Sequence, residues 1–111
     1  MKIVDLVTAL NLKVFSGANG MNNEVSGAYV SDLLSDVMGN VDKGEIWITL
    51  QTHKNIMAVA SLKELPGVIL VKGLIPDRAA MEKSDEENIP LLGTDEETFR
   101  IAGRLYEILI A

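Results

Sequence analysis

The sequence predicts an α/β fold: a small layered domain with a mostly parallel sheet flanked by helices. In the second half of the chain, short apolar segments alternate with helical segments three times in succession. Crossovers of this length favour parallel strands joined by right-handed connections. The strand segments are apolar throughout, which is typical of strands covered on both faces. A chain of 111 residues has the length of one domain, so we expect a single domain over residues 1–111.

The chain begins with a short helix over residues 3–10, because Leu6, Val7 and Leu10 share one side. Asn11 can end this helix in the left-handed conformation. The segments expected next are a strand over 12–15, a turn-rich loop over 16–23 and a strand over 25–30.

The middle of the chain contains a strand that we expect to be buried. Residues 45–50 (EIWITL) are rich in β-branched and aromatic side chains, and Trp47 is expected in the core with its N–H satisfied. Before this strand, Ser31 or Asp32 can cap a short helix that Gly39 can end.

Thr52 is the candidate N-cap of a helix over residues 53–63. The residues of this helix expected to face inward are Ile56, Val59 and Ala60. Pro66 and Gly67 end the unit, and a short apolar strand over residues 68–71 follows.

Asp77 is expected to cap the next helix, which runs to Glu87. Asn88 is a left-handed exit, and Ile89 packs against the helix end. The run over residues 83–87 (KSDEE) predicts a solvated helix face.

The last strand is expected over residues 90–92, and a final helix runs to about residue 109. Thr94 stands three residues before Glu97, which predicts a capping box at the start of that helix. The residues expected on its apolar side are Phe99, Ala102, Leu105, Tyr106 and Leu109.

Composition and charge exclude several classes of function. The chain has 10 Lys and Arg against 16 Asp and Glu, a net charge of −6, which argues against a general nucleic-acid or anionic-membrane binder. It has no cysteine, so disulfides, thiolate metal sites and thiol catalysis are excluded. With His53 as the single histidine, no multi-histidine metal site is expected, and no cofactor is expected.

Hydropathy predicts where the chain resides and how it assembles. No apolar run approaches the length of a membrane span, and no signal peptide is evident, so a cytoplasmic location is expected. Counting Gly and leaving out Tyr, roughly 54% of the residues are apolar, above the usual ~45–50%. A domain this small cannot bury all of them, so we expect a homo-oligomer, with a dimer favoured.

Catalytic motifs are missing from the sequence. Gly67 and Gly73 lie six apart, but Leu74 follows where a phosphate-binding loop has Lys and then Ser or Thr. A triad of Ser31 or Ser61 with His53 and Asp32 is possible on paper, yet no G-x-S-x-G elbow accompanies it. The chain is therefore not expected to be an enzyme.

Four segments resemble the DRTGG domain family, and the similarity extends from about Val4 to Leu109. They are AYVSDLLSDVMGN at 28–40, ITLQTHKNIMAVA at 48–60, GVILVKGLIPD at 67–77 and NIPLLGTDEETF at 88–99. The first of these resembles the stand-alone members of the family. No D-R-T-G-G string occurs, and Gln51-Thr52-His53-Lys54 stands where the family often has an Asp-Arg pair. A ligand role of that pair is therefore not carried over.

The resemblance implies a fold and a class of function. The family is related to the non-catalytic N-terminal domain of HPr kinase/phosphorylase and to domains attached to phosphate acetyltransferases and CBS-domain proteins. Those attached domains are thought to be regulatory or ligand-sensing, and their fold is an α/β sandwich akin to the N-terminal domains of some Mur ligases. Stand-alone members often sit among genes for hydrogenase-like iron–sulfur proteins.

A candidate ligand site lies at the carboxyl ends of the predicted strands, where open α/β sheets bind ligands. Polar residues, lysines and a glycine follow strongly apolar strands there. These candidate ligand-binding residues are Ser31, Asp32, Gln51, Thr52, His53, Lys54, Lys72, Gly73 and Thr94. The N-terminus of a helix and two lysines at this edge favour a phosphate or carboxylate. Alternatively, the same residues only cap helices or contribute to a subunit interface.

Two classes of function remain open, with a third less favoured. The first is a non-catalytic regulatory or sensory module that binds a small anionic ligand or a partner protein. The second is a protein–protein adaptor without a small-molecule ligand, serving for example a redox or hydrogenase-type system. The third is a phosphotransfer enzyme.

Overall fold

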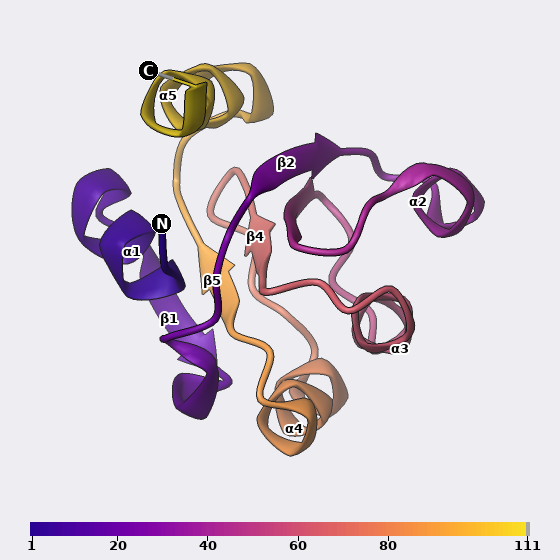
Figure 1. Ribbon diagram of the computed structural model, residues 1–111. Helices are drawn as coiled ribbons and strands as arrows, with labels where there is room; N and C mark the ends of the chain where they lie inside the picture. Colours follow the sequence, from indigo (N-terminus) through magenta and orange to yellow (C-terminus); the bar gives the residue numbers. More distant parts are fainter. Residues whose placement is uncertain (111) are drawn as a thin grey trace.

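The computed structural model describes residues 1–110, and they form a five-stranded sheet between two layers of helices (Figure 1). The strand order is β1-β5-β4-β3-β2. The strands are β1 (Lys13–Ser16), β2 (Gly27–Val30), β3 (Glu45–Thr49), β4 (Val68–Leu70) and β5 (Leu91–Gly93). The helices are α1 (Ile3–Leu10), α2 (Leu34–Asn40), α3 (Asn55–Leu62), α4 (Arg78–Glu87) and α5 (Thr98–Ile110), with a 3₁₀ turn η1 (Ala18–Gly20).

The sheet is mostly parallel, as the alternating pattern predicted. Strands β2, β3, β4 and β5 run parallel to one another, each joined to the next by a helix. Strand β1 pairs with β5 in the antiparallel direction, so its amino end meets the carboxyl end of β5. The α/β class and the mostly parallel, helix-flanked sheet are therefore confirmed.

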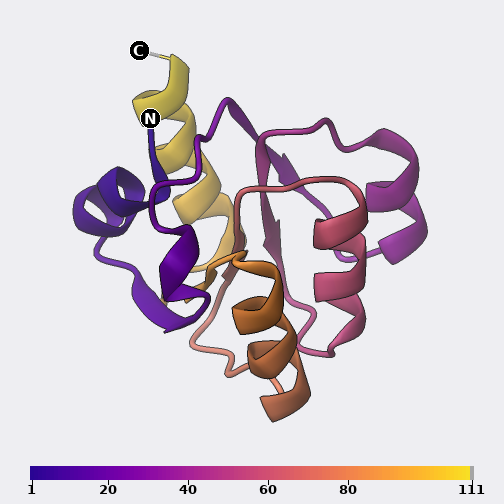
Figure 2. The same cartoon turned by 60° about the horizontal axis from the view of Figure 1, so that its bottom comes forward.

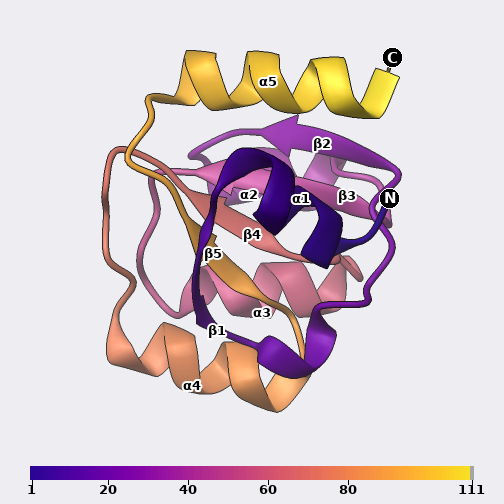
Figure 3. The ribbon, with the colours of Figure 1, turned by 90° about the vertical axis from the view of Figure 1, so that its left-hand side faces the viewer.

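Each face of the sheet is covered by its own helices. Helices α2, α3 and α4 cover one face, and α1 and α5 cover the other (Figure 3). On the first face, α3 contacts both α4 and α2 (Figure 2). Both faces of the sheet are buried. Successive residues along β3, and likewise along β4, therefore point alternately into one core and the other, and the residues that face either core are apolar.

Trp47, in the middle of β3, anchors the core under α2 and α3. Its side chain is fully buried, and its Nε1–H donates to the Ser31 carbonyl oxygen at 2.8 Å.

Two predicted helix ends are also confirmed: Asn11 and Asn88 both adopt left-handed backbone, with φ of 53° and 56°. After Asn88, the Ile89 N–H donates to the Ser84 carbonyl, and the Ile89 side chain is buried, as predicted.

The predicted apolar side of α5 is partly wrong. Ile101 and Leu105 are the fully buried residues of this helix, whereas Phe99 is 92% exposed and Tyr106 is 65% exposed. The sequence of α5 is apolar on two sides of the helix, so its periodicity could not show which side packs against the sheet.

Three smaller expectations about local structure are corrected. Helix α2 continues through Gly39 to Asn40, because this exposed glycine stays helical and Val41 takes the extended conformation instead. Ser16, expected in the surface loop over 16–23, is the last residue of β1 and is buried; the rest of the loop contains η1. Ser84, in the run expected to be solvated, is instead fully buried. Its Oγ–H donates to the Ile89 carbonyl oxygen at 2.6 Å, which satisfies the buried hydroxyl.

Candidate functional site

The carboxyl ends of β2, β3, β4 and β5 meet at one edge of the sheet, because the four strands are parallel neighbours. All nine predicted site residues follow these strand ends in the chain. The structure divides them into three groups. Ser31, Asp32 and Gln51 lie at the ends of β2 and β3, Thr52 to Lys54 precede α3, and Lys72, Gly73 and Thr94 lie at the ends of β4 and β5.

The first group is bound into a closed network between β2 and β3. The Asp32 carboxylate accepts a bond from the Thr49 hydroxyl at 3.0 Å and one from the Leu50 N–H at 2.7 Å. The Gln51 side-chain amide donates to the Asp32 carbonyl at 2.8 Å. Asp32 is therefore not a helix cap: Leu33 holds the N-cap position of α2, and the carboxylate fixes the end of β3 instead.

Ser31 belongs to the same part of the edge, and it also does not cap α2. Its hydroxyl oxygen accepts a bond from the Leu33 N–H at 3.2 Å, before the helix begins. Hydrogen bonding from Ser31, and next from Tyr29, lowers the pKa of the Asp36 carboxyl below its usual value. The bond from Tyr29 to Asp36, at 2.9 Å, in turn raises the pKa of the Tyr29 hydroxyl. These hydrogen bonds favour the charged form of Asp36. Because a carboxylate repels an anion, the part of the edge beside Asp36 is unsuited to an anionic ligand.

The second group makes the turn before α3. Thr52 does not cap this helix, which begins at Asn55 rather than at residue 53. The Thr52 carbonyl accepts a bond from the Asp77 N–H at 3.0 Å, joining the starts of α3 and α4. His53 is the residue whose side chain bonds to the start of α3, because its Nδ1 accepts a hydrogen bond from the N–H of Asn55, the first residue of the helix, at 3.3 Å. Lys54 is exposed and lies beside α4.

The third group is held by backbone bonds between the loops after β4 and β5. Lys72 and Gly73 have left-handed backbone, with φ of 59° and 69°. Their N–H groups donate to the carbonyls of Glu96 and Thr94, each at 2.9 Å. The predicted capping box of Thr94 and Glu97 is wrong: α5 begins at Thr98, and the Thr94 hydroxyl oxygen accepts from the Glu96 N–H at 3.2 Å. The segment from Thr94 to Glu97 is a connector tied to the β4 loop.

A cavity of about 330 Å³ opens beside the third group. Its lining residues are Asn11, Leu12, Lys13, Phe15, Gly73, Leu74, Gly93, Thr94 and Asp95. Two predicted residues, Gly73 and Thr94, contribute to it. The β1 side was missed, because the pairing of β1 with β5 brings a distant segment to this edge.

The chemistry of this cavity is mixed. The Lys13 ammonium lies 5.8 Å from the centre of the Phe15 ring, which places a positive charge beside an aromatic face. Asp95 contributes a carboxylate on the opposite, β5 side. Gly93 leaves the space that Phe15 occupies, since a side chain there would collide with the ring. The cavity thus offers a cation, a hydroxyl, a carboxylate and an apolar ring.

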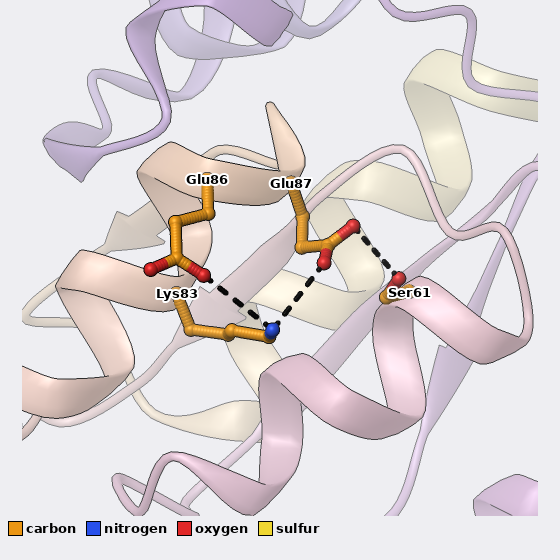
Figure 4. Close-up of polar contacts among 4 residues, drawn as sticks. All are labelled: Ser61, Lys83, Glu86 and Glu87. Carbon is orange, nitrogen blue, oxygen red and sulfur yellow. Dashed lines mark hydrogen bonds and ion pairs between the residues drawn. The ribbon is translucent and has the colours of Figure 1, made fainter.

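The run over residues 83–87 is only partly the solvated face that was predicted: Asp85 and Glu86 are exposed, whereas Ser84 is buried and Lys83 and Glu87 make polar contacts (Figure 4). The Lys83 ammonium pairs with Glu86 at 3.4 Å and with Glu87 at 3.5 Å, which raises the pKa of Lys83. Glu87 also accepts a bond from the Ser61 hydroxyl at 3.0 Å, joining α4 to α3. These contacts hold the end of α4 against α3.

Metal-ligating clusters and membrane-spanning helices are both absent from residues 1–110. Over this range, no three His, Asp or Glu side chains are grouped in a way that could hold a metal ion. None of the helices described is long and apolar enough to cross a membrane.

Comparison with known proteins places the chain in a family. The DRTGG domain matches residues 5–108. A solved structure of similar fold is that of the CBS and DRTGG domains of the regulatory region of Clostridium perfringens pyrophosphatase, complexed with its activator diadenosine tetraphosphate. The TM-score is 0.72 at 17% identity, over 94% of this chain and 45% of that one. Among curated proteins, none matches. The match over nearly the whole chain shows that this protein belongs to the DRTGG domain family.

Proposed function

We propose that this chain is a non-catalytic regulatory module that binds a small anionic ligand at the carboxyl edge of its sheet and works as a homodimer. Its membership of the DRTGG family supports a regulatory role, since the pyrophosphatase of similar fold carries this domain in its regulatory region. That protein was solved with a nucleotide activator, but this chain spans only 45% of its length.

The cavity between β1, β5 and the loop after β4 carries the proposal. Lys13 is exposed at its rim, and Lys72 directly precedes the lining residue Gly73. These lysines can hold a phosphate or carboxylate, the Thr94 hydroxyl can donate a further bond, and Phe15 offers an apolar surface to a ring. Asp95 adds an acceptor for ligand hydroxyls. This combination favours a phosphorylated, hydroxyl-bearing ligand over a bare anion.

The size of the cavity limits that ligand. Ligand pockets commonly have volumes of ~300–1,000 Å³. At about 330 Å³, this cavity is at the small end of that range. We therefore propose a ligand no larger than a mononucleotide, or part of a longer molecule.

A protein–protein adaptor is the second candidate function. Three large apolar side chains are exposed along one side of α5: Phe99 at 92%, and Tyr106 and Ile110 at 65% each. Such side chains on one surface mark a contact with another protein. An adaptor without a ligand would use this surface and would leave the cavity unused.

We expect AMP to raise the melting temperature of the protein by several degrees at saturating concentration. A ligand at 100 times its Kd stabilises a folded domain by about 2.7 kcal/mol, which corresponds to such a shift for a domain of this size. Lys13→Ala and Lys72→Ala should both reduce the shift while leaving the melting temperature without ligand nearly unchanged, because exposed charges contribute little to stability.

The matched control for this thermal-shift experiment is Lys43→Ala. Lys43 is an exposed lysine just before β3, at the amino end of the sheet. It should respond to AMP like the wild type. Equal responses of all four proteins would remove the cavity from consideration, and no shift with AMP, ADP, ATP or inorganic phosphate would favour the adaptor.

A further inference from the structure

Helix α5 carries an exposed apolar stripe that the domain itself does not cover. The stripe consists of Phe99, Gly103, Tyr106 and Ile110, spaced by four, three and four residues. Phe99, Tyr106 and Ile110 are 92%, 65% and 65% exposed, and a Cβ at Gly103 would meet nothing within 4 Å. This spacing is that of the contact positions of a helix that pairs with another helix. Figure 3 shows α5 on the outside of its layer, with one side away from the sheet.

The two borders of the stripe differ in character. Along one border, Ala102 and Leu109 line an apolar groove of about 350 Å³ between α5 and the edge strand β2. Along the other border lie Arg100 and Glu107, seven residues apart and exposed. Within residues 1–110 neither makes an ion pair, whereas the nearby Arg104 pairs with Glu96. Arg100 and Glu107 are thus two opposite charges available to a partner.

We propose that two copies of this chain associate through this stripe, with their α5 helices antiparallel. In this arrangement, Phe99 packs against Ile110 of the second copy, and the Tyr106 ring of the second copy covers Gly103. The residue without a side chain then lies opposite the largest one. A parallel pair would instead place Gly103 opposite Gly103 and leave a gap.

Charge complementarity supports the antiparallel pair. Residues on the same border of the stripe face each other in such a pair, so Arg100 of each copy meets Glu107 of the other. The dyad repeats this contact, giving two ion pairs on one border. On the other border, Ala102 meets Leu109 over the groove beside β2, where both sides are apolar. A second copy therefore matches both borders of the stripe.

The size of the surface predicts a weak dimer. A helix of 13 residues is about 20 Å long, so the buried area is at the low end for a specific interface. We expect the dimer to dissociate in the micromolar range. The inference rests on the proposed homodimer but not on the proposed ligand.

Gly103→Glu is the direct test, with sedimentation measured from micromolar to millimolar protein. The added side chain fits the free monomer, because nothing lies near the Cβ position, but it places a charge opposite Tyr106 of the second copy. We expect dimer affinity to fall about tenfold or more. Gly39→Glu is the matched control: this glycine lies in α2, is exposed and also has open space around it. Its dimer affinity should equal that of the wild type.

A charge exchange tests the orientation of the helices. Arg100→Glu and Glu107→Arg should each weaken the dimer, since each places like charges together, and the double variant should restore it. A wild type that stays at 12.1 kDa at all concentrations would overturn both the homodimer and this surface. A dimer unaffected by Gly103→Glu would overturn the surface alone. A double variant that remains weakened would overturn the antiparallel pairing.

Discussion

Replacing Trp47 by alanine is expected to lower the free energy of unfolding by about 3–5 kcal/mol, the usual cost of removing a large buried aromatic side chain. Trp47 is fully buried in the middle of β3 and belongs to the core under α2 and α3. The change also leaves the Ser31 carbonyl without its indole donor. Urea denaturation followed by far-ultraviolet circular dichroism measures the effect without depending on the chain's single tryptophan.

Trp47→Phe is a smaller change at the same position. Phenylalanine keeps an aromatic ring in the core but provides no N–H for Ser31. We expect a loss of about 1–3 kcal/mol, which combines the missing hydrogen bond to the part-buried Ser31 carbonyl with the smaller volume of the ring. A loss below about 1 kcal/mol for Trp47→Ala would contradict the central position that we assign to this side chain.

Gly17→Ala is expected to destabilise the protein by about 2 kcal/mol or more. Gly17 has a φ of 75°, where an alanine is strained by about 1–2 kcal/mol. A Cβ there would also lie 2.5 Å from the Ile89 carbonyl oxygen and 2.7 Å from the Pro90 Cα. The bond from the Gly17 N–H to the Asp85 carboxylate, at 2.7 Å, holds this turn against the end of α4, so the turn cannot move aside freely.

The same substitution at Gly39 should have the opposite sign. Gly39 is helical and exposed, and a Cβ there meets nothing within 4 Å. Alanine in an exposed helix is favoured over glycine by about 0.8–1 kcal/mol. Chemical denaturation of both variants compares them directly. Similar losses for the two would show that space and backbone angle at Gly17 do not determine its effect.

The fold could be predicted because local signals agreed with the tertiary structure. The turn residues Asn11 and Asn88 ended helices where expected, and the apolar run around Trp47 formed a strand buried on both faces. The direction of β1 could not be read from the chain, since a strand of four residues carries no information about its partner. The sequence also could not show which side of α5 packs against the sheet, because the helix is apolar on two sides.

The candidate site was predictable in outline only. Strand ends carry polar residues that can bond either to their own helix or to a neighbouring strand. Asp32 bonds to β3, and Thr94 bonds within the connector before α5, so neither acts as the expected cap. Lys13 and Phe15 joined the cavity only through the antiparallel pairing of β1. Sequence spacing placed the candidate residues along one edge of the sheet, but it could not show which part of that edge is hollow.

The most direct test of the proposed ligand site is to record amide chemical shifts by NMR during a titration with AMP. The amides expected to shift follow from the lining of the cavity. They are those of Asn11, Leu12, Lys13, Phe15, Gly73, Leu74, Gly93, Thr94 and Asp95, together with Lys72, which directly precedes Gly73. The amides of Lys43 and Gly44, at the amino end of the sheet, should stay unchanged and serve as internal controls. Saturable shifts confined to the cavity are the result we predict, and saturable shifts centred on any other surface, or none at all, would contradict this account.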